Sequence, residues 1–201
     1  MKSVLIDIMP FEVKPNSLIE SVNNGKLLVS GVLQRADAKN QNGRVYPKEI
    51  LKRESDKYHQ EFVNQRRAMG ELDHPESSVV NLKNVSHNIV DMNWEGDDLI
   101  GTVEILPTPS GNILRDLLNS GILLGISSRG LGSVKKDMRE NSDIVQDDFE
   151  LIAFDFVSNP STHGAFMYQQ NKINEGFNSS KNIVNPYANV ERIIHNIFSE
   201  L

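Results

Sequence analysis

Short apolar segments separated by turn residues make up most of the chain before about residue 160. Six of these segments are rich in Val, Leu and Ile and have the length of single strands. They cover residues 3–8, 26–34, 85–92, 98–105, 122–128 and 149–157. After the third of them, the turn-like sequence Trp94-Glu95-Gly96-Asp97 predicts a β-hairpin. The pattern therefore predicts a domain built mainly of strands.

Two segments have their apolar residues at helical rather than strand spacing. The first begins at Pro47, because proline is favoured at the first position of a helix. Its apolar positions are Ile50, Leu51, Tyr58 and Phe62. The second runs from Ser110, a capping residue, to Gly121, a common helix stop. Two helices among six strands predict an α+β fold, and we expect the ring of Tyr46 to pack on the core at the start of the first helix.

The composition changes after about residue 170. Residues 171–186 are rich in Asn, Ser and Lys and lack periodic hydrophobicity, which is typical of a linker. Apolar residues then recur at helical spacing, at Val190, Ile193, Ile194, Ile197 and Phe198. An amphipathic helix of this length is too short to be stable alone in water and needs a partner surface. We therefore expect a folded domain over residues 1–170 and a linker with an amphipathic tail over residues 171–201.

Charge and composition argue against several classes of protein. The 201 residues carry a net charge of −6, whereas a nucleic-acid-binding face would be basic. Every apolar run is shorter than the roughly 18 residues of a membrane span, and the N-terminal one is too short for a signal peptide. The sequence has no cysteine, which excludes disulfides, thiol nucleophiles and thiolate metal sites. We expect neither nucleic acid nor a membrane among the partners, and no cofactor.

Two short motifs carry groups suited to acyl transfer. Gly125-Ile126-Ser127-Ser128-Arg129-Gly130 places two serines after an apolar run, where we expect the chain to turn between glycines. Gly70-Glu71-Leu72-Asp73-His74-Pro75 places an imidazole in an acidic turn that proline ends. A serine becomes a good nucleophile when a nearby base accepts its proton, so the two motifs together indicate a hydrolase. The residues alone leave Ser127 and Ser128 equivalent, since neighbours on a strand point to opposite faces.

Three segments of the chain resemble one known family. They are NQNGRVYPKEIL (Asn40 to Leu51), GELDHP (Gly70 to Pro75) and GISSRGLGS (Gly125 to Ser133). Over about residues 29–161, their order and spacing are similar to those of the prohead core proteases of T-even-type tailed bacteriophages. That family consists of capsid maturation serine proteases, similar in fold to the herpesvirus assembly proteases, or assemblins. The resemblance implies a β-barrel-like core surrounded by helices and catalytic residues in the order histidine, then serine.

The resemblance also assigns roles by position. It makes Ser127 the nucleophile and His74 the general base. The third member is Asp155, a carboxylate in an apolar segment whose burial an imidazole N–H would compensate. His163 is the alternative, because it would reproduce the His-Ser-His arrangement of assemblins.

An oxyanion hole is expected next to the nucleophile. The backbone N–H groups of Ser128, Arg129 and Gly130 would frame it. The side chain of Arg129 would either hold that loop in place or bind an acidic group of the substrate. The sequence leaves both roles of Arg129 open.

Relatives in this family cut after glutamate where Leu or Ile lies two residues before it and a small residue follows, and they also process themselves. Ile173-Asn174-Glu175-Gly176 fits this pattern, and Leu18-Ile19-Glu20-Ser21 is a weaker match. We expect self-cleavage between Glu175 and Gly176, within the segment expected to be a linker. The implied substrates are prohead scaffold and major capsid proteins, in the interior of the phage prohead in the bacterial host cytoplasm. The oligomeric state stays open.

Two alternatives to a serine endopeptidase remain. A metal-dependent hydrolase would draw on a cluster of possible ligands, although no HExxH spacing is present. These are Glu71, Asp73, His74, His87 and Asp91. The other alternative is a catalytically silent capsid scaffold component that keeps the fold without the reaction. The presence of Ser127, His74 and Asp155 favours a serine endopeptidase, with no metal at the site.

Overall fold

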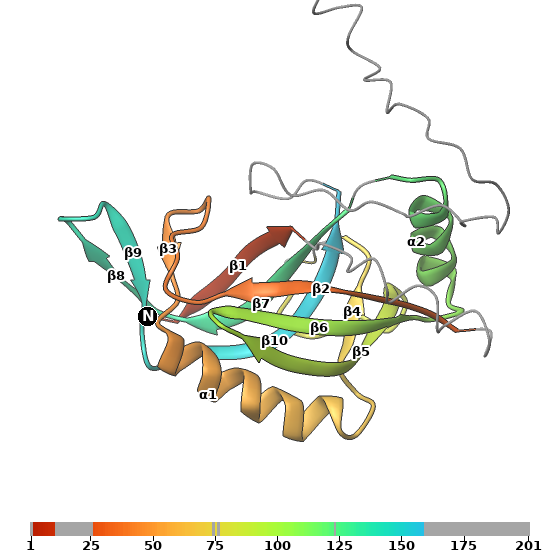
Figure 1. Cartoon of the computed structure of the whole chain (residues 1–201), viewed down its shortest axis with the longest axis horizontal. Coiled ribbons are helices and arrows are strands. Elements are labelled where there is room, and N and C mark those ends of the chain that lie inside the picture. The colour runs from red at the N-terminus through yellow and green to blue at the C-terminus, as the bar shows by residue number, and fades with distance from the viewer. Residues whose placement is uncertain (1, 11–25, 74, 76, 123, 159–201) are drawn as a thin grey trace, which may run out of the picture. The chain divides into compact units, whose positions relative to one another are not determined.

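The computed structural model describes residues 2–10, 26–73, 75, 77–122 and 124–158 (Figure 1). The chain divides into two units, Met1–Gln170 and Asn171–Leu201. All of the described residues belong to the first unit. The expected linker and amphipathic tail lie outside them, so they stay predictions.

The strands described form three sheets, and nearly all neighbouring strands are antiparallel. The first sheet has the order β1 (Ser3–Pro10), β7 (Gly125–Gly132), β10 (Glu150–Val157). The second has the order β2 (Leu27–Arg35), β6 (Asp98–Ile105), β5 (Val85–Glu95), β4 (Met69–Glu71). The third has the order β3 (Arg44–Val45), β9 (Ser142–Val145), β8 (Val134–Asp137), with β3 parallel to β9. Over the described part of the chain these sheets do not close into a barrel.

Two helices accompany the sheets. Helix α1 (Lys48–Tyr58) continues into a short π-helix, η2 (His59–Val63), and α2 (Pro109–Asn119) follows β6 (Figure 1). Pro47 directly precedes α1, as its fixed φ favours. The N-cap of α2 is Thr108, whose Oγ1 accepts a hydrogen bond from the Gly111 N–H at 2.9 Å. The prediction of a Ser110 cap was therefore wrong by two residues.

Aromatic rings fill much of the core between α1 and the sheets. Tyr46 packs edge-on against Phe149 with ring centroids 5.2 Å apart, and Tyr58 packs edge-on against Phe154 at 6.0 Å. Each of these rings is almost completely buried. Edge-to-face pairs of this kind add to the gain from burial alone. The expected packing of Tyr46 on the core is confirmed.

The α+β fold is confirmed, and one predicted strand begins later than expected. The strand β7 begins at Gly125 rather than at residue 122, because Ile122 completes the end of α2. The Ile122 N–H donates to the Leu117 carbonyl at 3.0 Å, and Gly121 has a positive φ of 74°. This is the hydrogen-bonding pattern by which a glycine ends a helix. Four short strands were not predicted: β3, β4, β8 and β9.

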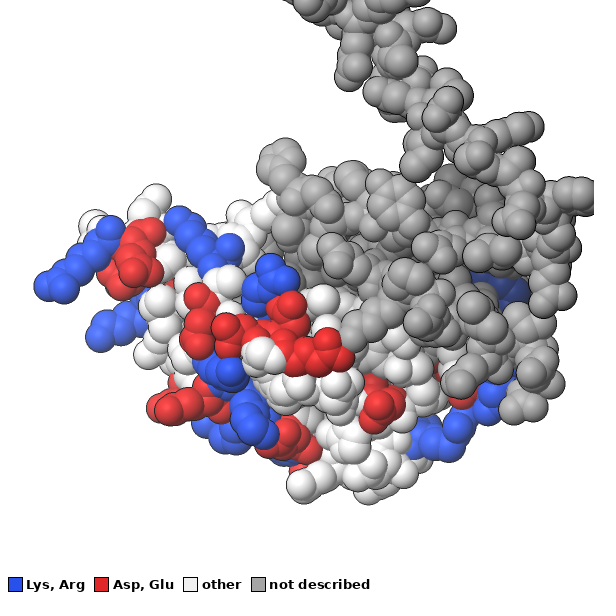
Figure 2. Space-filling view, in the orientation of Figure 1, with Lys and Arg blue, Asp and Glu red and all other residues white. Residues whose placement is uncertain are grey.

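Acidic and basic side chains are interspersed on the face shown in Figure 2. Exposed ion pairs in the described part of the chain include Arg35 with Asp98 at 2.5 Å and Lys48 with Asp97 at 2.8 Å. Exposed pairs of this kind contribute less than about 1 kcal/mol each to stability. No helix in the described ranges has the length and apolar character needed to span a membrane.

Candidate active site

The candidate nucleophile lies in the middle strand of the first sheet. Ser127 belongs to β7 and pairs in register with Ile8 on β1 and with Asp155 on β10. Residues opposite each other in an antiparallel pair project to the same side of the sheet. Ser127 and Asp155 therefore share one face, and both are 0% exposed. Strand pairing brings together two of the three residues expected to form a triad.

Ser128 faces the other side of β7. Its hydroxyl donates to the carbonyl oxygen of Asp7 at 3.3 Å, and its register partner on β10 is the core residue Phe154. Adjacent residues of a strand alternate between faces, so the two serines have different surroundings. Ser127 lies opposite the Asp155 carboxylate on β10, whereas Ser128 lies opposite the ring of Phe154 on β10 and opposite the buried Asp7 carboxylate on β1. The structure thus distinguishes two serines that are equivalent in the sequence.

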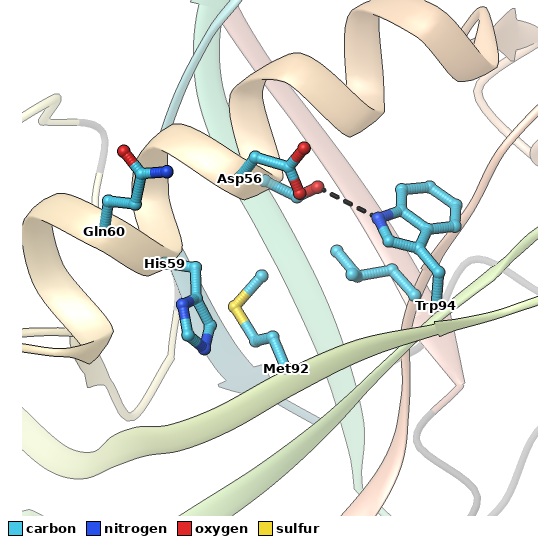
Figure 3. Close-up of a pocket in the computed structure, with 7 residues that line it drawn as sticks. Asp56, His59, Gln60, Met92 and Trp94 are labelled. Atoms are coloured by element: carbon cyan, nitrogen blue, oxygen red, sulfur yellow. Dashed lines mark hydrogen bonds between the residues drawn. The ribbon is translucent and has the colours of Figure 1, made fainter.

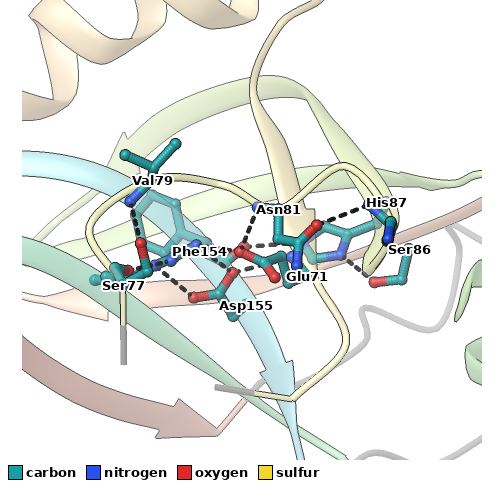
Figure 4. A network of polar contacts seen from close by, with 10 residues as sticks. Glu71, Ser77, Val79, Asn81, Ser86, His87, Phe154 and Asp155 are labelled. Carbon is teal, nitrogen blue, oxygen red and sulfur yellow. Dashed lines mark hydrogen bonds and ion pairs between the residues drawn. The ribbon is translucent and has the colours of Figure 1, made fainter. Parts of the chain in front are cut away.

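The carboxylate of Asp155 has partners on β7 and β4 (Figure 4). Arg129 Nη2 donates to Asp155 Oδ1 at 3.1 Å, and Arg129 Nε lies 3.0 Å from Oδ2. The backbone N–H of Glu71 donates to the same Oδ1 at 3.0 Å. Burial raises the pKa of Asp155 to about 6, while Arg129 and the Glu71 N–H oppose that rise. The carboxylate is therefore mostly ionised at neutral pH.

The residues that follow β4 and precede His74, the expected base, lie beside β10. Leu72 forms a β-bridge with Phe156, and the Asp73 N–H donates to the Phe156 carbonyl at 2.8 Å. Asp73 has a positive φ of 70°, a left-handed conformation that turns the chain at this point. His74 itself lies outside the described residues. Asp73, which precedes His74, is nonetheless hydrogen-bonded to Phe156, which follows Asp155.

A second buried carboxylate completes a polar network with Arg129. Glu71 Oε1 accepts hydrogen bonds from Arg129 Nη2 at 3.1 Å and from the Asn81 N–H at 3.0 Å. Arg129 Nη1 donates to the Ser77 carbonyl at 2.6 Å. The pairing of Glu71 with Arg129 was not predicted from the sequence. Their opposite charges, in two of the three family-like segments, were the signal that could have suggested the pair.

The segment expected to frame an oxyanion hole is a strand rather than a loop. Ser128, Arg129 and Gly130 continue β7, which is paired with β1 on one side and β10 on the other. Pairing on both sides directs backbone N–H groups toward the neighbouring strands. Gly130 also admits the ring of Phe149, since an added Cβ would lie 2.4 Å from Phe149 Cε2. The expectation of a turn between glycines was wrong, and this segment builds the sheet around Ser127.

The first family-like segment anchors β1 beside β7. Asp7 is almost fully buried on β1, and its Oδ1 accepts hydrogen bonds from Asn42 Nδ2 at 2.8 Å and Arg44 Nη1 at 3.1 Å. The Tyr46 hydroxyl donates to Asp7 Oδ2. Burial and the Asp7 charge raise the pKa of Tyr46 well above its usual value, so the hydroxyl remains a donor. Only the ring packing of Tyr46 was predicted from the sequence, and its hydrogen bond to Asp7 was not.

The residues considered as metal ligands have other contacts. The His87 ring is fully buried between Ser86 Oγ, 2.8 Å from Nδ1, and the Phe154 carbonyl, 3.0 Å from Nε2. Burial lowers the pKa of His87 to about 4, so the ring is neutral and Nε2–H donates to the carbonyl. Asp91 is largely exposed, 3.8 Å from the His59 ring. Within the described part of the chain, no three His, Asp or Glu residues are grouped as metal ligands.

A separate hollow of about 220 Å³ lies between α1 and the β5–β6 hairpin (Figure 3). Met92, Trp94 and Leu99 line it from the hairpin, and His59 is among the helical residues on the other side. Trp94 Nε1 donates to Ser55 Oγ at 3.2 Å across it. The hollow is lined by neither Ser127 nor Asp155, so it is distinct from the candidate active site.

Several expected site residues lie outside the part of the chain that the structure describes. They are His74, His163, Glu175, Gly176 and the segment Leu18 to Ser21. The choice between Asp155 and His163 as third member, and the expected self-cleavage, therefore stay predictions.

Comparison with known proteins gives consistent results. The family described as "Prohead core protein serine protease" matches residues 6–177. The prohead core protein protease of Enterobacteria phage T4 is 35% identical over 144 residues, which are 70% of this chain and 68% of that protein. The solved structure of the bacteriophage T4 capsid assembly protease, gp21, is similar with a TM-score of 0.71 at 30% identity, covering 78% of this chain and 98% of the other. The family match includes all of β7 and β10.

Proposed function

This chain belongs to the prohead core protein serine protease family, and from that membership we propose a serine endopeptidase with Ser127, His74 and Asp155 as its catalytic triad. It cuts scaffold and major capsid proteins inside a phage prohead, in the cytoplasm of the bacterial host. The observation that carries the assignment is the register of β7 with β10, which sets Ser127 opposite Asp155 on one face. The chain just before His74 is bonded to β10 beside that pair.

The three residues would act in sequence. Ser127 Oγ attacks the scissile carbonyl while His74 accepts its proton, and His74 then delivers that proton to the leaving amine. Asp155 orients the imidazole and stabilises its cationic form. The assembled geometry supports Asp155 over His163 as third member, because Asp155 is a buried carboxylate directly opposite Ser127. The proposal includes an assemblin-like serine protease fold for this α+β arrangement.

Labelling with a serine-directed fluorophosphonate tests the enzyme class. We expect one adduct, located at Ser127, in the wild-type chain, and none at that position in Ser127→Ala. Ser128→Ala serves as the matched control and should be labelled like the wild type. A wild-type chain that is folded but not labelled would support the alternative, a catalytically silent scaffold component.

Self-processing is the second part of the proposal. Cleavage between Glu175 and Gly176 would release Val190 to Phe198, which before cutting would dock the protease onto the prohead scaffold. Intact-mass spectrometry of the wild-type chain and of Ser127→Ala tests this step. The wild type should lose the mass of residues 176–201, and the variant should stay full length. A wild-type chain that stays intact at high concentration, or an equally truncated variant, would rule out self-cleavage.

A further inference from the structure

We propose that Arg129 is a positioning residue that holds the segment carrying His74 against the strand of Asp155. The inference rests on the proposed function, since it concerns the same site. Its basis is that one buried guanidinium contacts both the beginning and the end of this segment as well as the Asp155 carboxylate.

The contacts of Arg129 lie on both sides of position 74. Nη2 binds the Glu71 carboxylate at 3.1 Å and Nη1 binds the Ser77 carbonyl at 2.6 Å. Between these points, the Asp73 N–H is bonded to the Phe156 carbonyl of β10. The segment is thereby fixed at residues 71, 73 and 77. A planar guanidinium can make these contacts at once, which a lysine ammonium cannot do.

Burial separates this role from substrate binding. Arg129 is 0% exposed, and each of its three guanidinium nitrogens lies within 3.1 Å of a protein oxygen. An arginine that recognised the glutamate of a substrate would need a nitrogen directed toward solvent or toward the substrate cleft. Of the two roles that the sequence left open for Arg129, the structure favours holding the protein together.

The charges of the network add an electrostatic consequence. Two buried carboxylates, Glu71 and Asp155, surround one guanidinium, so the cluster keeps one excess negative charge. That charge is suited to stabilise an imidazolium at His74. Of the other titratable groups packed nearby, Tyr58 on α1 and His87 on β5 are both neutral at pH 7, because burial raises the pKa of the first and lowers that of the second. Arg129 therefore sets the charge available to the His74–Asp155 pair.

The rate of fluorophosphonate labelling at Ser127, measured against pH, tests this role. In Arg129→Gln, loss of the positive charge should move the acid limb of the profile upward by at least one pH unit. Labelling at neutral pH should then fall by up to 10-fold for each unit of that shift and recover in part at alkaline pH. In Glu71→Gln, loss of a negative charge should move the limb the opposite way, since both pKa values of the coupled pair fall.

Arg129→Lys separates charge from geometry. Lysine keeps the positive charge, so the acid limb should stay within about half a unit of the wild type, while the plateau rate should drop by 10-fold or more. Full labelling activity in Arg129→Lys would overturn the positioning role. If the acid limb of the pH profile does not move in Arg129→Gln or in Glu71→Gln, the network is merely structural, whatever the plateau rate of labelling. If Arg129→Gln fails to fold, the opposite shift in Glu71→Gln still decides the electrostatic claim.

Hydrogen exchange keeps the inference testable apart from the proposed chemistry. In Arg129→Lys, the amides of residues 71–77 should exchange at least 10-fold faster than in the wild type, while those of β5 and β6 should be unchanged. A wild type that is not labelled would refute the proposed function. The hydrogen exchange of residues 71–77 could still be compared between the wild type and Arg129→Lys. A labelled wild type with unchanged exchange in Arg129→Lys would refute only the role of Arg129.

Discussion

Gly70 lies directly against the imidazole of His87. A Cβ added at position 70 would be 2.3 Å from His87 Nε2 and 1.9 Å from the Phe154 carbonyl oxygen, which the ring itself contacts. The missing side chain lets β4 lie close to β10. The next residue, Glu71, can therefore donate its N–H to Asp155. The glycine of the GELDHP segment is thus explained by the close approach of two strands that build the site.

Gly70→Ala should disturb both stability and activity. The added methyl group meets a backbone carbonyl that cannot rotate away, so the free energy of unfolding should fall by about 1–3 kcal/mol. Activity should fall by 10-fold or more even where the variant is folded, because β4 leads directly into the His74 segment. Urea denaturation and fluorophosphonate labelling measure the two effects.

Gly96→Ala is the matched control for that substitution. Nothing lies within 4 Å of a Cβ added at Gly96, although its φ of 63° is left-handed. It should lose about 1–2 kcal/mol of stability from the backbone alone and keep its labelling rate. Equal loss of activity in the two variants would contradict the proposed coupling of β4 to the site.

Ser127→Ala and Ser128→Ala should have opposite outcomes. Removing the proposed nucleophile should reduce turnover by roughly 10⁴- to 10⁶-fold, as for triad residues elsewhere, without unfolding the chain. Ser128→Ala loses only a 3.3 Å hydrogen bond to the Asp7 carbonyl and should retain activity within about tenfold. The rate of peptide cleavage by the two variants, each first shown to be folded, tests this prediction. An inactive Ser128→Ala beside an active Ser127→Ala would shift the nucleophile by one residue.

The third member of the triad can be identified by a pair of variants. Asp155→Asn should reduce turnover strongly, yet less than Ser127→Ala does, since an amide cannot stabilise an imidazolium. His163→Ala should leave turnover close to that of the wild type. Steady-state kinetics with one peptide substrate compares them. A harmless Asp155→Asn together with a severe His163→Ala would establish the assemblin-like arrangement instead.

The sequence pattern predicted the long elements well because local signals determine them. Val, Leu and Ile at strand spacing located β2, β5 and β6, and Pro47 marked the start of α1. The strand β4 was missed because its three residues contain a glycine and a glutamate, and its place depends on contacts with β5 and β10. No local signal specifies such contacts.

The polar network around the site was missed for a similar reason. Arg129 and Glu71 are far apart in the sequence, and charged residues within apolar segments are usually expected at the surface. The two charges are brought together by the pairing of β7 with β10 and by the bridge of Leu72, next to Glu71, with Phe156 on β10. The alternation of Ser127 and Ser128 was predictable, but the partner on each face was not.

Tyr46→Phe tests the anchor of β1. The substitution keeps the ring against Phe149 and removes the hydroxyl that donates to the buried Asp7 carboxylate. Hydrogen bonds to charged groups contribute about 1.5–3 kcal/mol, so the free energy of unfolding should fall by that amount. Tyr58→Phe is the matched control, because its hydroxyl makes no hydrogen bond to a carboxylate among the described contacts. A similar change in both variants would show that the Asp7 contact does not anchor β1.

His87 and Asp155 should have opposite effects on stability as the pH falls. The folded-state pKa of His87 is about 4, below its ordinary 6.5, so the unfolded state binds more protons between these values. Its stabilising contribution is complete above pH 6.5 and is lost as the pH falls toward 4, by about 3 kcal/mol in all. The folded-state pKa of Asp155 is about 6, above its ordinary 3.8, so the folded state gains stability as the pH falls from 6 toward 3.8.

The two contributions largely cancel in the wild type, and single substitutions should separate them. His87→Gln keeps a donor for the Phe154 carbonyl and removes the titrating ring, so its stability relative to the wild type should rise as the pH falls from 6.5 to 4. Asp155→Asn should show the reverse, with relative stability falling over pH 6 to 4. Urea denaturation of the three proteins at half-unit pH steps gives the free energy of unfolding of each variant relative to the wild type. The carboxylates that the proteins share cancel in this difference. Parallel curves for all three would mean that neither buried group has the pKa shift on which this expectation depends.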